Sequence, residues 1–132
     1  MASFFSSKTN CSKCHNGFNF TNFTFQNNGL YSIYEDRGRE RISLKEEDRA
    51  KFKVPTLRNV AISAPYMHDG SLATLELVIE HYNQGGKGHE NQSSFIRPLN
   101  LSKQEKADLV NFLKSLTDTT FLTNPAFNIN QL

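Results

Sequence analysis

The clearest regular pattern in the chain is a helical repeat of apolar residues in its second half. Four apolar side chains recur at i, i+3, i+4 and i+7 and would share one helix face: Leu75, Val78, Ile79 and Tyr82. Two glycines, Gly85 and Gly86, follow directly, and glycine commonly ends a helix. The pattern predicts a helix over 74–84.

A second helical repeat follows a polar loop over 87–101. Ser102 and Glu105 have the spacing of a capping box, in which each side chain accepts a hydrogen bond from the other residue's backbone N–H group. Apolar residues then recur on one face: Leu109, Phe112, Leu113 and Leu116. This predicts a helix over 102–116. A C-terminal tail over 119–132 has little pattern.

The remaining segments have weak periodicity and are expected to be mostly loop. Residues 16–34 are rich in Asn, Phe, Thr and Gly, which indicates a loop lined with aromatic side chains. The charged run 35–53 mixes both signs and indicates a solvated connector, with one helical turn near 44–50. The segment 54–70 contains two prolines and predicts an extended loop with a short helix over 57–62. No segment predicts a strand, so the expected fold class is all-α with long loops.

Composition limits the classes of function. The 132 residues suit one compact domain, expected over 1–118, and they include 11 Phe and no Trp. Many Phe residues fit a small helical domain around a large flat apolar ligand, and they fit an ordinary core equally well. The formal net charge of +2 is small and evenly spread, so nucleic acid and membrane surfaces are not expected partners. No apolar run reaches the length of about 18 residues that a membrane span needs.

The two cysteines of the chain are three positions apart, in the run Cys11-Ser-Lys-Cys14-His15. A helical turn with thiols at i and i+3 can reach the two vinyl groups of one porphyrin, and a histidine at i+4 can bind its iron. His15 would bind iron through its distal nitrogen while the other nitrogen donates to a backbone carbonyl. The motif therefore favours covalent attachment of one haem c.

Other uses of these residues stay open at this point. Cys11, Cys14 and His15 could bind zinc with one more ligand, although His81 and His89 form no second close pair. A thioredoxin-like redox pair would need a βαβ context that is not visible. The motif could also occur by chance at a helix start, which would leave a module without haem.

The second axial position of such a haem has several candidates downstream. Met67 lies in the proline-bounded loop, and a loop methionine is a common ligand in small cytochromes. Tyr82 lies on the apolar face of the helix predicted over 74–84. Further candidates are His68, His81 and His89. Arg58, between Pro55 and Pro65, could pair with a haem propionate.

A longer run of residues carries a family resemblance. Residues 52–76, which include Val-Pro-Thr-Leu-Arg-Asn-Val-Ala and Ala-Pro-Tyr-Met-His-Asp-Gly, resemble the C-terminal haem domain of bacterial di-haem cytochrome c peroxidases and their MauG-like branch. The opening Cys-x-x-Cys-His-Asn-Gly and the closing Leu-x-x-Phe-Leu-x-Ser-Leu-Thr also match. The resemblance covers about residues 4–118.

The resemblance implies a class I cytochrome c-like helical fold and a periplasmic protein with two such domains. In that family the N-terminal haem reduces hydrogen peroxide, and the C-terminal haem takes electrons from a small donor protein, a cytochrome c or a cupredoxin. This chain matches the second domain only and lacks the peroxidatic haem. Since residues 1–10 also resemble the end of a helix whose beginning is missing, we expect a piece of a longer protein. The alternative is a free-standing mono-haem electron carrier.

The resemblance also implies roles for single residues. Peroxidases of this family have their methionine ligand at the position of Tyr82, whereas the MauG-like branch has a tyrosine ligand there. Tyr82 is therefore the expected second ligand, with Met67 as the alternative. A calcium ion between the two domains is held partly by backbone carbonyls at the positions of Ser63 and Pro65, and its other ligands belong to the missing domain.

Overall fold

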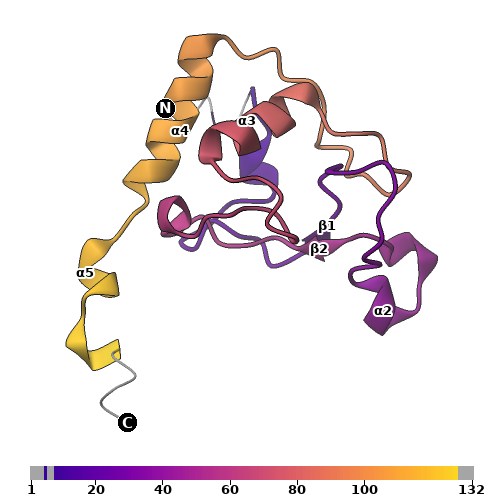
Figure 1. Ribbon diagram of the computed structural model, residues 1–132, viewed down its shortest axis with the longest axis horizontal. Helices are drawn as coiled ribbons and strands as arrows, with labels where there is room; N and C mark the ends of the chain where they lie inside the picture. Colours follow the sequence, from indigo (N-terminus) through magenta and orange to yellow (C-terminus); the bar gives the residue numbers. More distant parts are fainter. Residues whose placement is uncertain (1–4, 6–7, 128–132) are drawn as a thin grey trace.

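The computed structural model describes residue 5 and residues 8–127. Short helices and a small sheet are joined by long loops (Figure 1). In chain order the elements are η1 (Cys11–Lys13), β1 (Phe25–Gln26), α2 (Glu40–Ser43), η2 (Glu46–Asp48), β2 (Phe52–Lys53), η3 (Val60–Ile62), α3 (Leu75–Gln84), α4 (Lys103–Ser115), α5 (Thr119–Leu122) and η4 (Pro125–Phe127). The expected helix end over 1–10 falls mostly outside the described residues.

The two helices with clear periodicity are confirmed. The N-cap of α3 is Thr74, whose Oγ1 accepts a hydrogen bond from the Leu77 amide at 3.2 Å, and Gly85 ends the helix in the left-handed conformation at φ 84°. The capping box of α4 is complete: the Ser102 side chain accepts from the Glu105 amide, and the Glu105 side chain accepts from the Ser102 amide. Local caps therefore fix both ends of α3 and the start of α4.

The weaker predictions need corrections. The short helix expected over 57–62 is the 3₁₀ turn η3, and the helical turn expected near 44–50 is confirmed as the 3₁₀ turn η2, with α2 before it as an addition. The expectation of no strand is wrong, because β1 and β2 pair antiparallel with Phe25 opposite Lys53 and Gln26 opposite Phe52. Two-residue strands are too short to produce an alternating pattern. The tail contains α5, whose N-cap Asp118 accepts from the Phe121 amide at 3.0 Å.

The buried apolar residues form two clusters. The first joins α3 to α4 and consists of Phe5, Leu75, Ile79, Leu101, Leu109, Val110 and Leu113. The second is smaller, lies in the loop region and consists of Leu30, Tyr34 and Ala50. Partly buried residues pack against both clusters, including Cys11, Leu57 and Tyr66 on the first and Phe52 and Met67 on the second. These partly buried side chains face the space between the clusters.

Candidate functional site

A cavity of about 370 Å³ lies between the two clusters, which is within the usual size range of ligand sites. Its walls are mostly apolar and include Val54, Pro55, Leu57, Val60, Tyr66, Val78, Phe95, Ile96 and Leu99. The side chains with candidate chemistry also line it: Cys11, Cys14, His15, Met67, His68 and Tyr82. The fold thus brings residues from five separate segments to one apolar chamber.

The two cysteines reach the cavity from the turn that begins at η1. The Cys14 and His15 amides both donate to the Cys11 carbonyl, at 3.2 and 2.8 Å, so the three side chains leave a single helical turn. Neither cysteine forms a disulfide. Burial raises the pKa of both thiols, so without a bound metal both keep their protons at neutral pH.

Zinc finds no support in the rest of the site. Among residues 5 and 8–127, no group of three or more His, Cys, Asp or Glu side chains is arranged to hold a metal ion. A structural zinc ion needs four such ligands.

His15 is oriented by a backbone carbonyl. Its Nδ1 atom lies 3.0 Å from the Phe20 carbonyl oxygen, and since that oxygen only accepts, Nδ1 carries the proton and donates. Burial lowers the pKa of His15, so the ring is neutral at neutral pH. The Nε2 lone pair is left for a metal ion in the cavity.

Tyr82 extends into the cavity from α3. Burial raises the pKa of its phenol to about 12, partly offset by a hydrogen bond with Asn28. At neutral pH the phenol therefore keeps its proton unless a cation lies next to its oxygen. An iron ion would supply that charge.

Met67 lines the same cavity from the loop before α3. Its backbone has the left-handed conformation, with φ 76°, and its sulfur accepts a hydrogen bond from Asn28 Nδ2 at 3.1 Å. One sulfur lone pair is thus already engaged. Asn28 was not predicted from the sequence, because a lone asparagine in an aperiodic loop carries no distinctive signal.

The three other histidines differ in position. The Nε2 atom of His81 lies 3.0 Å from the Asn28 carbonyl oxygen, outside the cavity, and His89 Nδ1 lies 3.3 Å from the Asn27 amide nitrogen. His68 does line the cavity, but its ring stacks on Phe52 with the centroids 4.0 Å apart.

The remaining predicted residues lie outside the cavity lining. Arg58 donates from Nε to the Phe18 carbonyl oxygen at 2.9 Å, and its guanidinium lies 4.3 Å from the centre of the Phe18 ring. The pairing of Arg58 with a propionate stays a prediction. Ser63 and Pro65 are exposed on the segment after η3, and the calcium site there also stays a prediction.

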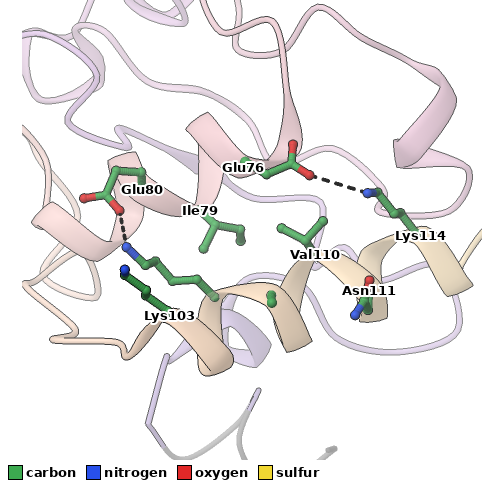
Figure 2. Close-up of a pocket in the computed structure, with 9 residues that line it drawn as sticks. Glu76, Ile79, Glu80, Lys103, Val110, Asn111 and Lys114 are labelled. Atoms are coloured by element: carbon green, nitrogen blue, oxygen red, sulfur yellow. Dashed lines mark hydrogen bonds and ion pairs between the residues drawn. The ribbon is translucent and has the colours of Figure 1, made fainter.

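A second hollow, an open groove of about 430 Å³ between α3 and α4, contains none of the predicted residues. Figure 2 shows the apolar Ile79 and Val110, which line it, extending toward each other from the two helices. Two ion pairs flank it: Glu80 with Lys106 at 2.8 Å, and Glu76 with Lys114 at 3.4 Å. This groove is a solvated helix–helix junction.

Within the part of the chain that the structure describes, no helix is long and apolar enough to cross a membrane.

Comparisons with known proteins point in one direction. A family model described as cytochrome c matches residues 3–117. The methylamine utilization protein MauG of Methylorubrum extorquens is 38% identical over 114 residues, which cover 85% of this chain and 32% of that protein. The cytochrome c551 peroxidase of Nitrosomonas europaea is 37% identical over 111 residues, which cover 81% of this chain and 30% of that protein. The chain thus spans about a third of the length of these relatives.

A solved structure of a MauG-like protein associated with microbial copper homeostasis superposes with a TM-score of 0.91 and 34% identity. The match covers 99% of this chain and 50% of the other. The similarity therefore extends through the loops that build the cavity as well as through the helices.

Proposed function

Because the chain belongs to the cytochrome c family, we propose that it is the electron-transferring haem domain of a di-haem cytochrome c peroxidase or a MauG-like oxidase. The expected class I cytochrome c-like fold is confirmed, with the small sheet as an addition. The expected cofactor, one covalent haem c, is confirmed by the same family membership together with the spacing of Cys11 and Cys14.

The single observation that carries the residue assignments is that one cavity receives both cysteines, His15 and Tyr82. In this proposal Cys11 and Cys14 would form the two thioether bonds to the haem, and His15 Nε2 and the Tyr82 oxygen would bind its iron. The apolar walls exclude water, which holds the site in a low-dielectric environment. The haem supplies the one-electron redox couple of its iron.

The relatives support a second haem domain in the parent protein, and the electron donor is proposed from the family resemblance. We propose that the parent protein also contains an N-terminal peroxidatic haem domain, which receives electrons from this domain. The electron donor would be a small cytochrome c or a cupredoxin, and it would bind the parent protein in the periplasm. The calcium ion proposed at the Ser63 and Pro65 carbonyls would lie between the two domains.

The test is covalent haem in protein produced in a host that exports the chain and has haem attachment machinery. The Soret band should survive denaturation and acid–acetone extraction, and the mass should exceed that of the polypeptide by one haem. The double variant Cys11→Ala/Cys14→Ala should lose the extraction-resistant haem, whereas Ser12→Ala, between the two cysteines, should keep it. A bare polypeptide mass in the unaltered chain would overturn the proposal.

A further inference from the structure

Two basic side chains line the cavity within the described part of the chain, Lys53 and Arg97. The ammonium group of Lys53 donates to the Val54 carbonyl at 3.4 Å and lies 5.2 Å from the centre of the Phe23 ring. The guanidinium of Arg97 has no hydrogen bond, ion pair or ring contact with any described residue. Arg97 is solvent-exposed, and of the two cavity cations it is the one whose charged group has no contact with another described residue.

The backbone holds Arg97 firmly in this place. A Cβ atom at Gly85 would lie 2.4 Å from Pro98 N and 2.7 Å from the Arg97 carbonyl carbon, so the 97–98 backbone packs directly on the end of α3. The Leu99 amide donates to the Asn83 carbonyl at 3.1 Å.

Two side-chain contacts reinforce this placement on either side of Arg97. Asn83 Oδ1 accepts from the Leu101 amide at 2.8 Å, and Gln92 Nε2 donates to the Ile96 carbonyl at 3.2 Å. The segment that carries Arg97 is thus tied to the last turn of the helix that carries Tyr82.

We propose that Arg97 is a cofactor-binding residue that pairs with a propionate carboxylate of the haem. The inference rests on the proposed function, since it requires the haem to occupy this cavity. Placing a carboxylate against apolar walls costs free energy unless a cation and hydrogen-bond donors interact with it. The planar guanidinium offers both, with two parallel N–H donors toward the two carboxylate oxygens.

Arg58 offers a matched comparison. It is the other arginine predicted to serve a propionate, but its Nε is bonded to the Phe18 carbonyl and its guanidinium lies between the Phe18 and Phe20 rings, 4.3 and 5.6 Å from their centres. Arg97 has no such alternative partner. Of the two, only Arg97 combines a place at the cavity with a free guanidinium.

The charge has a measurable consequence. Ferric haem carries one more positive charge than ferrous haem, so a cation at the propionate disfavours the ferric form and raises the reduction potential. Arg97→Gln should therefore lower the reduction potential. It should also change the propionate bending vibration in the resonance Raman spectrum. Arg97→Lys, which keeps the positive charge, should have a reduction potential close to that of the unaltered chain.

The experiment compares the haem-loaded chain with Arg97→Gln, Arg97→Lys and the control Arg58→Gln, each at equal haem content by the Soret band. The inference requires a larger fall in potential for Arg97→Gln than for Arg58→Gln. An equal or smaller fall, or no change in the propionate vibration, would overturn it. Absence of covalent haem from the unaltered chain would instead overturn the proposed function, and the inference with it.

Discussion

At the level of single residues, Tyr82 and Met67 line the same cavity, and both side chains hydrogen-bond Asn28. The Met67 sulfur already accepts a hydrogen bond from Asn28 Nδ2. The Tyr82 phenol, with a pKa raised by burial to about 12, gains most from a neighbouring cation because burial outweighs the Asn28 hydrogen bond and disfavours its anionic form. This difference favours Tyr82 as the second iron ligand.

Tyr82→Phe tests that choice, because it removes the phenol oxygen and keeps the ring. We expect a large change in the ferric absorption spectrum of the haem-loaded chain, whereas Met67→Leu, of similar volume, should change it little. If Met67→Leu changes the spectrum and Tyr82→Phe does not, the ligand is Met67. If neither does, the iron is five-coordinate or bound by a histidine.

A second residue-level prediction concerns Asp69, which lies two residues after Met67. Burial opposes ionisation of Asp69, but hydrogen bonds from the Tyr31 hydroxyl at 2.6 Å and the Ser71 amide at 3.0 Å outweigh it and lower the pKa to about 2. The folded state therefore binds the Asp69 proton less readily than the unfolded chain, whose aspartates have a pKa of about 3.9. The stabilisation is fully present above about pH 4 and is lost as the pH falls toward 2.

The measurement is urea unfolding of the haem-loaded chain at a series of acidic pH values. Asp69→Asn should flatten the fall in unfolding free energy across this window, and Tyr31→Phe, which removes one donor, should flatten it partly. An unchanged acid profile in both variants would mean that the Tyr31–Asp69 hydrogen bond does not persist in solution.

At the level of elements, the end of α3 requires glycine at position 85 for two reasons. The backbone there has a positive φ, and the 97–98 backbone packs directly against it. Gly85 and Gly88 both have positive φ, 84° and 79°, so alanine costs about 1 kcal/mol of backbone strain at either position. Nothing lies within 4 Å of a Cβ at Gly88, whereas a Cβ at Gly85 would overlap the backbone of Arg97 and Pro98.

The pair of variants separates strain from overlap. Gly88→Ala should lower the unfolding free energy by about 1 kcal/mol, and Gly85→Ala by about 2 to 4 kcal/mol, because overpacking adds about 1–3 kcal/mol. Chemical denaturation of the two haem-loaded variants measures both values. Equal losses would show that the 97–98 backbone does not pack against Gly85.

Prediction from sequence succeeded where the determining contacts are local. The ends of α3 and α4 were predictable because each cap involves residues within four positions of the helix. The β1–β2 pair was not, because it joins residues 26 and 28 positions apart through two-residue strands. Arg97 was missed for a similar reason: its place at the cavity depends on contacts with Gly85 and Asn83, not on any motif.

At the level of the whole molecule, the interior is completed by the cofactor. Without it, the apolar walls of a site of about 370 Å³ stay exposed to water and lack the packing contacts that a haem would make. We therefore expect the chain without haem, as in Cys11→Ala/Cys14→Ala, to lose fixed tertiary packing.

Near-ultraviolet circular dichroism and dye binding measure this loss. The chain without haem should have a weak near-ultraviolet signal and should bind a hydrophobic dye. The haem-loaded chain should have a strong near-ultraviolet signal and should not bind the dye. A cooperative unfolding transition of equal midpoint in both forms would contradict this account of the fold.

The C-terminal segment behaves differently, because its apolar side chains contribute little to either cluster. Beyond Asp118 the chain leaves the body of the domain (Figure 1), and Phe121 and Phe127 are 54% and 64% exposed. Their rings pack mainly on each other, with centroids 5.0 Å apart. Among the described residues, the last hydrogen bond from this part of the chain to the body of the domain is that of the Asp118 amide, which donates to Asn59 Oδ1 at 2.7 Å.

A chain that ends after Asp118 should therefore keep the haem spectrum and an unfolding free energy within about 0.5 kcal/mol of the full chain, as for other changes to exposed surface. A chain that ends after Lys114 is the control. It loses Leu116, which packs against the first cluster and whose carbonyl accepts from the Asn59 amide at 3.1 Å, so it should be clearly less stable. Urea unfolding of the three haem-loaded chains measures these differences in unfolding free energy. If the chain ending after Asp118 is as unstable as the shorter one, the domain extends past residue 118.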